Sequence, residues 1–498
     1  AYQSTLRNGA SNDVWTMDPD DPESAEIVLE SPDGSWWGPS EFSERGTQLL
    51  VTNYVSITDA RAHVVDLDSG EVTLLAGGPD APGYNVPVAF DDADDGFWLL
   101  TDQGSEFTQL AWQPLEAGAD PVIVTTDIPW NVSAVAMSDD RRRMAFTVNE
   151  GGTTALYLMD PRTREYRRVE GLPVGVAGSL QFSPDGSKLG LTLNTPQTPS
   201  DTFSLELGKR PLDYGKLTRW TYSEVGGLDT TTFVTPRLVR FPTFDEVDGK
   251  PREIPAWVYT PPGDGPFPVV VSIHGGPESQ ARPYFSSTYQ LWLRELGVAV
   301  VVPNVRGSAG YGKTYVALDN GFKREDSVRD IGALLDWIGT QPELDAERVA
   351  VFGGSYGGYM VLASAVHYSD RLAAAVDIVG ISSFVTFLEN TQDYRRDLRR
   401  VEYGDERDPE MRAFLEKISP LNNVEEIAIP MFVVQGQNDP RVPVTEAEQI
   451  VKALREQGHK VWYMNGLNEG HGFRRKENRD IYQQATVLFF REHLLGGD

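Results

Sequence analysis

The sequence predicts two domains of different classes, a β-propeller over residues 1–245 and an α/β domain with a mostly parallel sheet over residues 246–498. Three observations lead to this prediction. A strand-and-turn pattern recurs at intervals of 45 to 48 residues in the first half, prolines crowd the junction, and apolar strands alternate with amphipathic helices in the second half. A chain of 498 residues is also long enough for two or three domains.

The repeat in the first half consists of an apolar residue, a short polar turn and an alternating apolar strand. It begins at four positions, which are Phe42, Phe90, Met137 and Phe182. A second shared segment, clearest at 64–70 and 156–161, follows about two dozen residues later. Short strands repeated with a period in the forties are typical of propeller blades, whereas unrelated hairpins would have this spacing only by chance. About 245 residues hold about five such repeats, which leaves open a propeller that is incomplete at its N-terminus.

The sequence pattern changes over 241–268, where seven prolines interrupt the chain. Beyond them we expect strands at 269–273, 298–302, 349–352, 373–379, 431–434 and 461–464. The expected helices include 331–339, 359–366, 446–456 and 481–493. Continuous apolar strands that alternate with helices predict a parallel sheet covered on both faces, and such sheets bind ligands beyond the carboxyl ends of their strands.

The composition excludes several classes of function. Aspartate and glutamate number 73 and lysine and arginine 44, which gives a net charge of −29. Residues 1–250 alone hold 39 acidic and 18 basic residues, so the first half is an acidic body. This charge argues against partners such as nucleic acid or an anionic membrane, which attract basic surfaces. The absence of cysteine excludes disulfides, thiolate catalysis and cysteine-ligated zinc.

Neither a metal nor a cofactor is expected from the sequence. No apolar run reaches the roughly 18 residues of a membrane span, and no charged-then-apolar signal peptide opens the chain. We therefore expect a cytoplasmic location, although a first residue Ala1 also fits a processed or truncated product. Assembly into a homo-oligomer is left open by the sequence. The acidic composition fits either a saline habitat or a coding bias, and the sequence does not distinguish the two.

The sharpest chemical signal is the run Gly-Gly-Ser-Tyr-Gly-Gly at 353–358, which follows a predicted strand and opens a predicted helix. A serine in such a tight strand-to-helix turn is the nucleophile elbow of α/β-hydrolases. The alternatives are a structural glycine-rich turn and a phosphate-binding loop. A phosphate-binding loop would have a lysine after its last glycine, but Tyr359 and Met360 follow here. Ser355 is therefore the predicted nucleophile, and the second domain is predicted to be an α/β-hydrolase.

A serine hydroxyl needs a general base, and the chain has six histidines. His471 lies in the loop between the strand at 461–464 and the last helix, where hydrolases of this architecture have their base. His367 lies on the helix after the elbow and is expected to point away from the serine, and His493 ends the terminal helix. We therefore predict His471 as the base.

Asp439 follows the strand at 431–434 and is the predicted third member, which orients the imidazole. It completes the chain order Ser, Asp, His that this fold uses. Its rivals are Asp377 inside an apolar strand, and Asp405 and Asp408 in a charged stretch.

The transition state also needs hydrogen-bond donors for its oxyanion. His274-Gly275-Gly276-Pro277 follows the first strong strand and is similar to the glycine-rich oxyanion loop of lipases and esterases. We predict the backbone N–H groups of Gly276 and Tyr356 as the two donors. His274 itself is expected to be a structural histidine.

On these motifs the sequence resembles the prolyl oligopeptidase family of serine peptidases, most closely its acylaminoacyl-peptidase and bacterial dipeptidyl-peptidase branch. The stretches that carry the resemblance are 274–277, 304–312, 353–359, 438–443 and 470–472. The resemblance covers residues from about 235 to 498, whereas the first half matches only in architecture. It implies a propeller that caps the hydrolase, with the active site in the cavity between them. It also assigns Ser355, Asp439 and His471 as the triad, and no metal.

The resemblance implies further substrate-binding residues. Arg441, two residues after the triad aspartate, corresponds to an arginine that binds a substrate carbonyl. The segment 381–387 matches the apolar wall of the first specificity pocket, to which Ile381, Phe384 and Phe387 would contribute; core packing is an equally open interpretation. Prolyl oligopeptidases proper have a tyrosine at the position of His274, and this departure puts strict proline specificity in doubt.

Three functions of different classes remain. The first is a serine peptidase that cleaves short peptides through an acyl-enzyme, of the acylaminoacyl-peptidase or dipeptidyl-peptidase type. The second is a carboxylesterase or amidase that acts on small acyl compounds with the same triad. The third is a binding protein whose propeller does the work, which the complete set of catalytic motifs argues against. The arginine at 441 favours the peptidase, because an esterase has little use for a cationic clamp on a peptide carbonyl. Arg306 is expected to have a structural role, in which it ties its loop to acidic residues.

Overall fold

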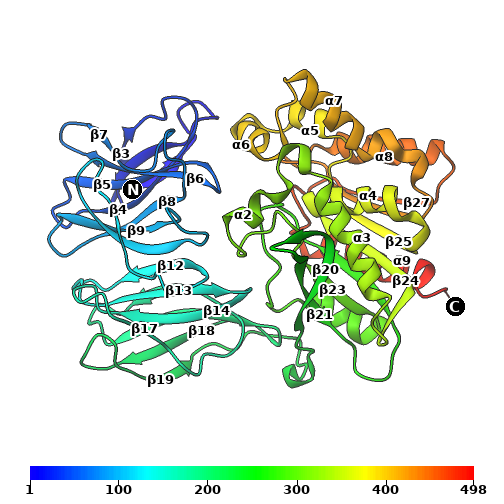
Figure 1. Ribbon diagram of the computed structural model, residues 1–498, viewed down its shortest axis with the longest axis horizontal. Helices are drawn as coiled ribbons and strands as arrows, with labels where there is room; N and C mark the ends of the chain where they lie inside the picture. The colour runs from blue at the N-terminus through cyan, green and yellow to red at the C-terminus, as the bar shows by residue number, and fades with distance from the viewer. Residues whose placement is uncertain (498) are drawn as a thin grey trace. The chain divides into compact units, whose positions relative to one another are not determined.

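The computed structural model describes residues 1–497 and divides the chain into two compact units (Figure 1). The first unit contains Ala1–Gly226 and the short segment Gly310–Thr314, and the second contains Gly227–Ala309 and the chain from Tyr315 onward. The boundary expected at residues 245/246 falls inside β20 (Arg237–Val247), which belongs to the sheet of the second unit. The prolines near 242–255 lie within an edge hairpin of that sheet, where proline is tolerated, and they do not mark a linker.

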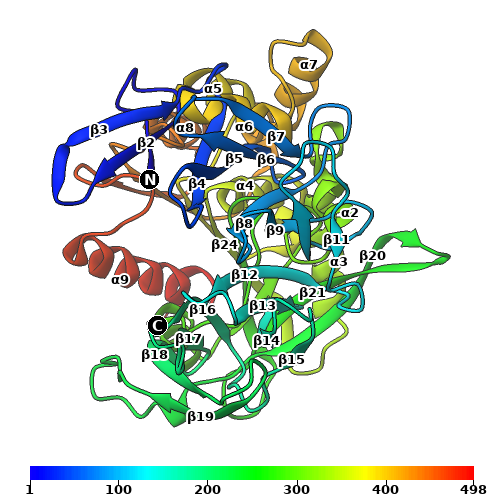
Figure 2. The same ribbon diagram turned by 90° about the vertical axis from the view of Figure 1, so that its left-hand side faces the viewer.

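The first unit contains five antiparallel sheets within the described residues, and in each sheet consecutive strands of the chain are neighbours (Figures 1 and 2). The first sheet has three strands and each of the others has four. The strands are β1 (Tyr2–Ser4), β2 (Asp13–Asp18), β3 (Asp21–Leu29); β4 (Trp36–Phe42), β5 (Gln48–Ser56), β6 (Asp59–Asp66), β7 (Val72–Ala76); β8 (Asn85–Phe90), β9 (Gly96–Thr101), β10 (Gln109–Pro114), β11 (Val122–Ile123); β12 (Asn131–Met137), β13 (Met144–Glu150), β14 (Thr153–Met159), β15 (Tyr166–Arg168); β16 (Val176–Phe182), β17 (Lys188–Thr195), β18 (Thr198–Leu207) and β19 (Tyr214–Arg219).

The recurring sequence pattern corresponds to one structural feature, the turn between the first and second strands of each four-stranded sheet. In the last of these sheets the N–H of Ser183 donates to the carbonyl of Lys188 at 2.9 Å, and the N–H of Gly186 donates to Ser183. The turn before β13 has the same closing bond, from Ser138 to Arg143 at 2.9 Å. The second shared segment ends the third strand, as at β6 and β14. The repeat therefore marks the same hairpin in each four-stranded sheet.

Neighbouring sheets of the first unit pack face to face through their apolar side chains. Leu50 and Val64 of the second sheet share a buried cluster with Phe97 and Leu99 of the third. The remaining pairs of consecutive sheets are joined in the same way, each through its own cluster. This stacking of twisted four-stranded sheets is the packing of propeller blades.

The second unit is built on one eight-stranded sheet with the order β20-β21-β23-β22-β24-β25-β26-β27. Its strands β22 to β27 pair in parallel, and β20 and β21 pair antiparallel at one edge. The predicted mostly parallel sheet is therefore confirmed. The remaining strands are β21 (Lys250–Tyr259), β22 (Phe267–Ile273), β23 (Ala299–Pro303), β24 (Leu344–Gly354), β25 (Ala374–Ile378), β26 (Met431–Gly436) and β27 (Val461–Gly466).

Helices cover both faces of this sheet. Phe432 and Val433 are adjacent in β26 and belong to clusters on opposite faces, the first with α9 and the second with α8. The helices are α1 (Ser287–Leu291), continued by a π-helical turn (Trp292–Leu296), α2 (Lys313–Val316), α3 (Asp326–Ile338), α4 (Tyr356–Tyr368), α5 (Phe384–Asn390), α6 (Asp393–Tyr403), α7 (Pro409–Ile418), α8 (Val444–Glu456) and α9 (Lys476–His493). Short 3-10 turns lie at Thr230–Thr232, Ala317–Asp319, Gly321–Lys323, Ser369–Arg371 and Pro420–Glu426.

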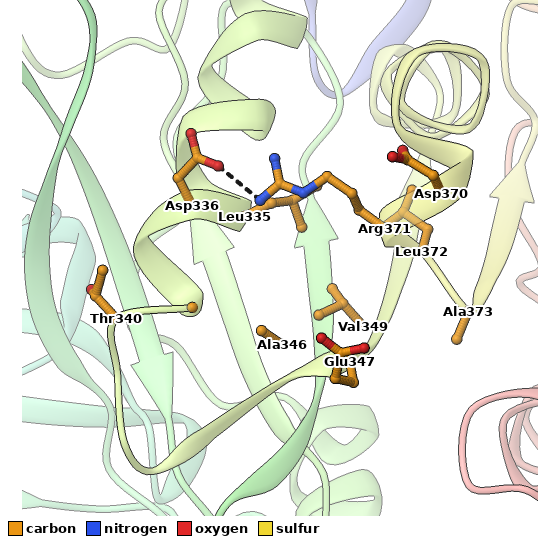
Figure 3. A pocket seen from close by; sticks show the side chains of 11 residues that line it. Leu335, Asp336, Thr340, Ala346, Glu347, Val349, Asp370, Arg371, Leu372 and Ala373 are labelled. Carbon is orange, nitrogen blue, oxygen red and sulfur yellow. Dashed lines mark ion pairs between the residues drawn. The ribbon is translucent and has the colours of Figure 1, made fainter.

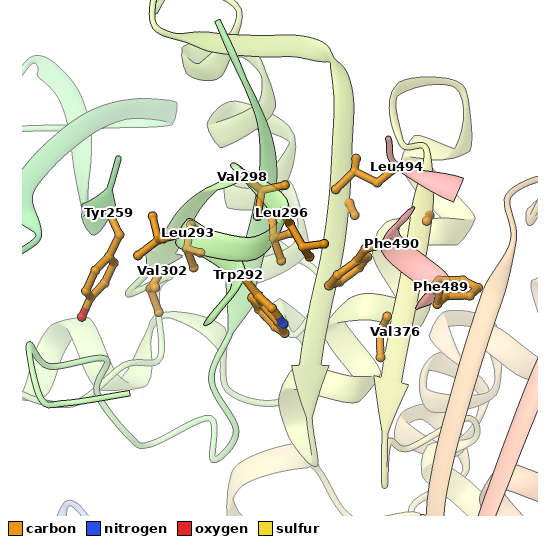
Figure 4. Close-up of a cluster of buried hydrophobic side chains, with 14 of the residues drawn as sticks. Tyr259, Trp292, Leu293, Leu296, Val298, Val302, Val376, Phe489, Phe490 and Leu494 are labelled. Atoms are coloured by element: carbon orange, nitrogen blue, oxygen red, sulfur yellow. The ribbon is translucent and has the colours of Figure 1, made fainter. Parts of the chain in front are cut away.

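The larger of the two clusters forms the main core of the second unit (Figure 4). Trp292 lies at its centre, fully buried, with its ring edge-on to Phe490 of α9 at 5.3 Å between centroids. Val376 of β25 and Phe489 pack in the same cluster. Because α9 closes this core, the terminal helix also supports the loop that precedes it, which carries His471. None of the helices in the described part of the chain combines the length and the apolar character needed to cross a membrane.

Candidate active site

Ser355 lies between β24 and α4 in a strained turn, as predicted. Its backbone adopts φ 60° and ψ −121°, an unfavourable conformation for a residue with a side chain. The flanking positions have no room for a Cβ atom. One added at Gly353 would lie 2.4 Å from the carbonyl oxygen of Gly357, and one at Gly357 would lie 2.2 Å from that of Ile273. The glycines are therefore required for the turn that presents the half-buried Ser355 at the N-terminus of α4.

His471 and Asp439 are in contact, and their geometry fixes the tautomer of the imidazole. His471 Nδ1 lies 2.7 Å from Asp439 Oδ2, and the Asp439 side chain is fully buried. Because a carboxylate only accepts hydrogen bonds, Nδ1 carries the proton and Nε2 is left as the basic nitrogen. The second oxygen, Asp439 Oδ1, accepts from the backbone N–H groups of Arg441 at 2.8 Å and Val442 at 3.0 Å. The carboxylate is thereby held in one orientation.

The sheet brings the three predicted triad residues to one edge. Ser355 follows β24, Asp439 lies three residues after β26, and His471 lies five residues after β27. These strands run parallel in one sheet, with β25 between β24 and β26. Their carboxyl ends therefore share the edge at which this kind of sheet binds ligands.

The loop that carries His471 is held by a buried carboxylate that the sequence reading missed. Glu469 is 4% exposed and accepts from the N–H groups of Arg474 and Arg475, both at 3.1 Å, and from Asn478 Nδ2 at 2.7 Å. Burial alone would raise the pKa of Glu469, but the hydrogen bonds from Asn478 and from the two backbone groups outweigh it and lower the pKa. Only the pattern of backbone donors reveals this role, and nothing in the sequence signals it.

The glycine loop after β22 lies against the elbow. A Cβ added at Gly275 would lie 3.3 Å from the Cβ of Ser355, so this loop reaches the nucleophile directly. Gly276 has φ 131°, and a Cβ there would lie 2.7 Å from the backbone nitrogen of Glu278. Tyr356 is the first residue of α4, where backbone N–H groups have no partner within the helix. Both predicted oxyanion donors, Gly276 and Tyr356, therefore belong to segments that meet at Ser355; their catalytic role stays a prediction.

His274 has the structural role that was expected. Its Nδ1 lies 2.7 Å from the carbonyl oxygen of Gly275, and its Nε2 lies 2.9 Å from Ser308 Oγ. Burial lowers the pKa of His274. Since the Gly275 carbonyl can only accept, His274 Nδ1 donates to the peptide group whose N–H belongs to Gly276.

The Arg441 side chain is exposed, and it makes no hydrogen bond or ion pair with any residue that the structure describes. Its backbone is fixed, since its N–H donates to Asp439 and its carbonyl accepts from Thr391 Oγ1 at 2.8 Å. A free guanidinium on a fixed backbone beside the triad aspartate is suited to bind a carbonyl. The clamp role nevertheless stays a prediction.

The three predicted pocket residues are all buried. Ile381 is 1%, Phe384 0% and Phe387 4% exposed. The Phe384 ring packs against Tyr359 at 4.6 Å and Tyr403 at 5.2 Å between centroids. This packing gives the segment a core role, and a second role as the wall of a specificity pocket stays a prediction.

The aspartates that rivalled Asp439 lie in other environments. Asp377 lies in β25 with an exposed fraction of 1%, and burial, with a smaller contribution from the charge of Glu446, raises its pKa to about 7. Asp405 accepts from Arg407, which lowers the pKa of Asp405 to about 2. Asp408 caps the N-terminus of α7.

Arg306 is confirmed as a structural residue. It is buried, and its guanidinium donates to Asp330 at 2.9 Å and to Asp245 at 2.9 Å. Its own backbone N–H also donates to Asp330.

Two further findings concern metal ligands and a pocket outside the site. Among the described residues, no group of three or more histidine, aspartate or glutamate side chains could hold a metal ion. The pocket of about 450 Å³ in Figure 3 lies around the Asp336–Arg371 ion pair and is lined by none of the predicted site residues. It is therefore separate from the candidate active site.

Comparison with known proteins identifies relatives of this chain. Residues 283–498 match the prolyl oligopeptidase family. A dipeptidyl aminopeptidase BIII from Pseudoxanthomonas mexicana is 36% identical over 239 residues, which is 47% of this chain and 34% of that protein. A dipeptidyl peptidase family member 6 from Caenorhabditis elegans is 26% identical over 447 residues, which is 84% of this chain and 59% of that protein. The chain thus spans about a third to three fifths of the length of these relatives.

Solved structures are similar to this chain over almost its whole length. A puromycin hydrolase superposes with a TM-score of 0.81 at 20% identity and covers 96% of this chain and 72% of its own. An acylaminoacyl peptidase from Pyrococcus horikoshii superposes with a TM-score of 0.72 at 21% identity, with 95% and 73% coverage. The predicted fold class, a β-propeller followed by an α/β-hydrolase domain, is confirmed. Over residues 283–498, the chain is similar to the prolyl oligopeptidase family.

Proposed function

We propose that the protein is a serine peptidase that hydrolyses short peptides through an acyl-enzyme, with Ser355, His471 and Asp439 as its triad. One observation carries the proposal. The imidazole of His471 is oriented by a buried carboxylate at 2.7 Å, and a strained serine lies at the same edge of the same sheet. A base with a fixed tautomer and a serine in an elbow, at one edge of one sheet, are the groups that acyl transfer requires.

In the proposed reaction Ser355 Oγ attacks the peptide carbonyl while His471 Nε2 takes its proton. The carbonyl oxygen becomes an oxyanion that the backbone N–H groups of Gly276 and Tyr356 stabilise. The C–N bond then breaks, His471 gives its proton to the leaving amine, and the acyl group stays on Ser355. Water, deprotonated by His471, attacks the ester, the bond between the acyl carbon and Ser355 Oγ breaks, and His471 returns the proton to Oγ as the acid product leaves. Asp439 keeps its hydrogen bond to His471 Nδ1 and stabilises the imidazolium.

The proposed substrates are short peptides, with residues removed from the amino-terminal end. The named relatives include dipeptidyl aminopeptidases and acylamino-acid-releasing enzymes, which supports this class and leaves free and blocked termini as alternatives. Peptide libraries with alanine or proline before the scissile bond, each with a free and an acetylated terminus, distinguish the two. The same libraries distinguish exopeptidase from endopeptidase cleavage by the lengths of the products.

A fluorophosphonate probe tests the proposed nucleophile, because it reacts only with an activated serine. We expect wild-type protein to be labelled and Ser355→Ala to be unlabelled. Ser364→Ala is the matched control, since Ser364 lies in α4 and its buried hydroxyl has no hydrogen-bond partner in the described residues. Labelling of Ser355→Ala, or hydrolysis of peptides by it at the wild-type rate, would contradict the proposal.

The remaining expectations from the sequence concern partners. The net charge of −29 supports the proposal that nucleic acids are not among them. A cytoplasmic location and assembly into a homo-oligomer stay predictions, which cell fractionation and light scattering test.

A further inference from the structure

Tyr403, the last residue of α6, makes a hydrogen bond that no motif in the sequence signals. Its side chain is almost fully buried, with 2% exposed, and its hydroxyl donates to the carbonyl oxygen of Gly276 at 3.2 Å. The two residues are 127 positions apart in the chain. Helix α6 lies beside α5 in the second unit (Figure 1). A helix outside the predicted catalytic loops thus contacts the loop that carries a predicted oxyanion donor.

The ring of Tyr403 contacts the second predicted donor residue and the predicted pocket wall. It stacks on Tyr356 at 6.0 Å with an interplanar angle of 15°. It also lies 5.2 Å from Phe384 and 6.0 Å from Phe387, measured between ring centroids. One side chain therefore contacts both residues whose N–H groups would bind the oxyanion and two residues of the predicted wall.

Charged neighbours hold Tyr403 in this position. Arg399, one turn earlier in α6, also donates to the Gly276 carbonyl at 3.2 Å and pairs with Glu402 at 2.5 Å. Arg324 is fully buried, and its guanidinium lies 5.0 Å from the centre of the Tyr403 ring. Its Nη2 donates to the Glu402 carbonyl at 2.7 Å. Burial, followed by the charge of Glu402, raises the pKa of the Tyr403 phenol, so the hydroxyl remains a donor.

The loop around Gly276 needs these hydrogen bonds because glycine has no side chain that limits its backbone dihedral angles. On one side His274 fixes the peptide group between Gly275 and Gly276 by donating to its carbonyl oxygen. On the other side Tyr403 and Arg399 fix the carbonyl of Gly276. The donor N–H lies between these two anchors, and both must hold if it is to point at the site of the oxyanion before the reaction begins.

We propose that Tyr403 is a positioning residue for the oxyanion hole, which acts through the carbonyl of Gly276 and, by ring stacking, on Tyr356. The inference rests on the proposed function and deepens it. It assigns transition-state positioning to the C-terminal end of α6, with Arg399 as the second donor. A tyrosine that only filled the core would act through its ring, and its hydroxyl would matter for stability alone.

Tyr403→Phe separates these two roles because it deletes the hydroxyl and keeps the ring. The matched control is Tyr359→Phe, which makes the same deletion in the same aromatic cluster, where the hydroxyl is buried without a hydrogen-bond partner in the described residues. The measurements are kcat and KM for a peptide and for a p-nitrophenyl ester, the rate of fluorophosphonate labelling, and Tm. Loss of a whole oxyanion donor lowers kcat by roughly 10²–10³-fold, so a loosened donor should lower it by about 10-fold.

We expect Tyr403→Phe to lower kcat and the labelling rate by similar factors for both substrates, with KM within about twofold, because every substrate forms the oxyanion. Tyr359→Phe should keep wild-type kcat at a comparable Tm. A second pair covers the case in which Tyr403→Phe folds poorly. Arg399→Met, which loses the other donor to Gly276, should lower kcat, and Arg399→Lys, which keeps the charge, should restore part of it.

Tyr403→Phe with the kcat and labelling rate of Tyr359→Phe would overturn the inference while leaving the proposed function intact. A change confined to KM would also overturn it, since that result would place the role of Tyr403 in the pocket wall. Wild-type protein that neither cleaves peptides nor reacts with the probe would instead overturn the proposed function on which the inference rests.

Discussion

His471 and Asp439 form a hydrogen-bonded pair in which Nδ1 of the imidazole lies 2.7 Å from Oδ2 of a carboxyl group that is fully withdrawn from solvent. The two residues come from different strand-following loops, 32 positions apart. Two backbone N–H groups hold the other carboxyl oxygen, so Asp439 has little freedom to turn away. The pair thus has the rigidity that a general base needs to keep one tautomer.

Asp439→Asn should lower kcat by roughly 10³–10⁴-fold with little loss of Tm. The amide can keep the hydrogen bonds to the backbone through its oxygen, but its NH₂ group would face His471 Nδ1 and favour the opposite tautomer. Steady-state kinetics with a peptide substrate, together with thermal unfolding, check this. If Asp439→Asn turned over substrate at near the wild-type rate, the orienting role would belong to another carboxylate.

Arg441→Ala should reduce kcat/KM for peptides far more than for a small p-nitrophenyl ester, which has no further carbonyl for the guanidinium to hold. We expect a loss of about 10-fold or more on peptides, the range for a hydrogen bond to a charged group. Arg474→Ala is a suitable control, since Arg474 is an exposed arginine on the nearby His471 loop. Equal losses on both substrates would indicate a structural arginine and favour the esterase alternative.

Asp377→Asn should make stability less dependent on pH and leave catalysis intact. Burial raises the pKa of Asp377 to about 7, whereas an unfolded aspartate titrates near about 3.9. Between these values the native state holds a proton that the unfolded state has released. The free energy of unfolding of the wild type should therefore fall as pH rises from about 4 to about 7, by about 1.4 kcal/mol per pH unit at most from this group.

The variant lacks this proton, so its stability should fall less steeply over that window and exceed that of the wild type above about pH 7. Urea unfolding at several pH values measures the slope. Peptide hydrolysis by the same variant is a second readout, because Asp377 was the rival for the triad role. A variant with the wild-type slope would contradict the buried-proton account, and an inactive but folded variant would return Asp377 to the site.

Features of the fold that depend on residues close together in the chain could be predicted from the sequence, whereas contacts between distant residues could not. Local signals were read correctly. The turn that recurs from Phe42 to Phe182 marks the same hairpin in four sheets, and the glycines around Ser355 mark a turn that excludes side chains. The prolines between 242 and 255 were misleading about the domain boundary. They lie in an edge hairpin, and a proline-rich edge hairpin cannot be told from a proline-rich linker by composition.

The missed residues act over long distances in the chain or through backbone groups. Tyr403 and Arg399 lie in a helix with the charged sequence of a solvated surface, and no periodicity shows that one end of it reaches Gly276. The hydrogen bonds of Glu469 go to backbone N–H groups, which carry no sequence signature. Chemistry carried by a short motif is therefore visible in one sequence, whereas the side chains that position it are visible only in the fold.

The acidic composition leads to a final prediction about association rates. A net charge of −29 should concentrate cationic peptides around the protein and repel anionic ones. At low salt, kcat/KM for a lysine-bearing peptide should therefore exceed that for its glutamate twin. Because the Debye length shrinks from about 30 Å at 0.01 M to about 3 Å at 1 M salt, the ratio should fall towards a constant value as salt rises.

The competing explanation is that the acidic surface only keeps the protein hydrated and soluble. It predicts a ratio that does not change with salt, because specific contacts in the binding site would then be the only source of preference. Measuring kcat/KM for both peptides from 0.01 to 1 M NaCl separates the two, with a neutral glutamine peptide as the reference for general salt effects. A flat ratio would remove steering and leave only local recognition, whereas a ratio that falls with salt while the glutamine peptide stays constant would assign the preference to the field of the whole chain.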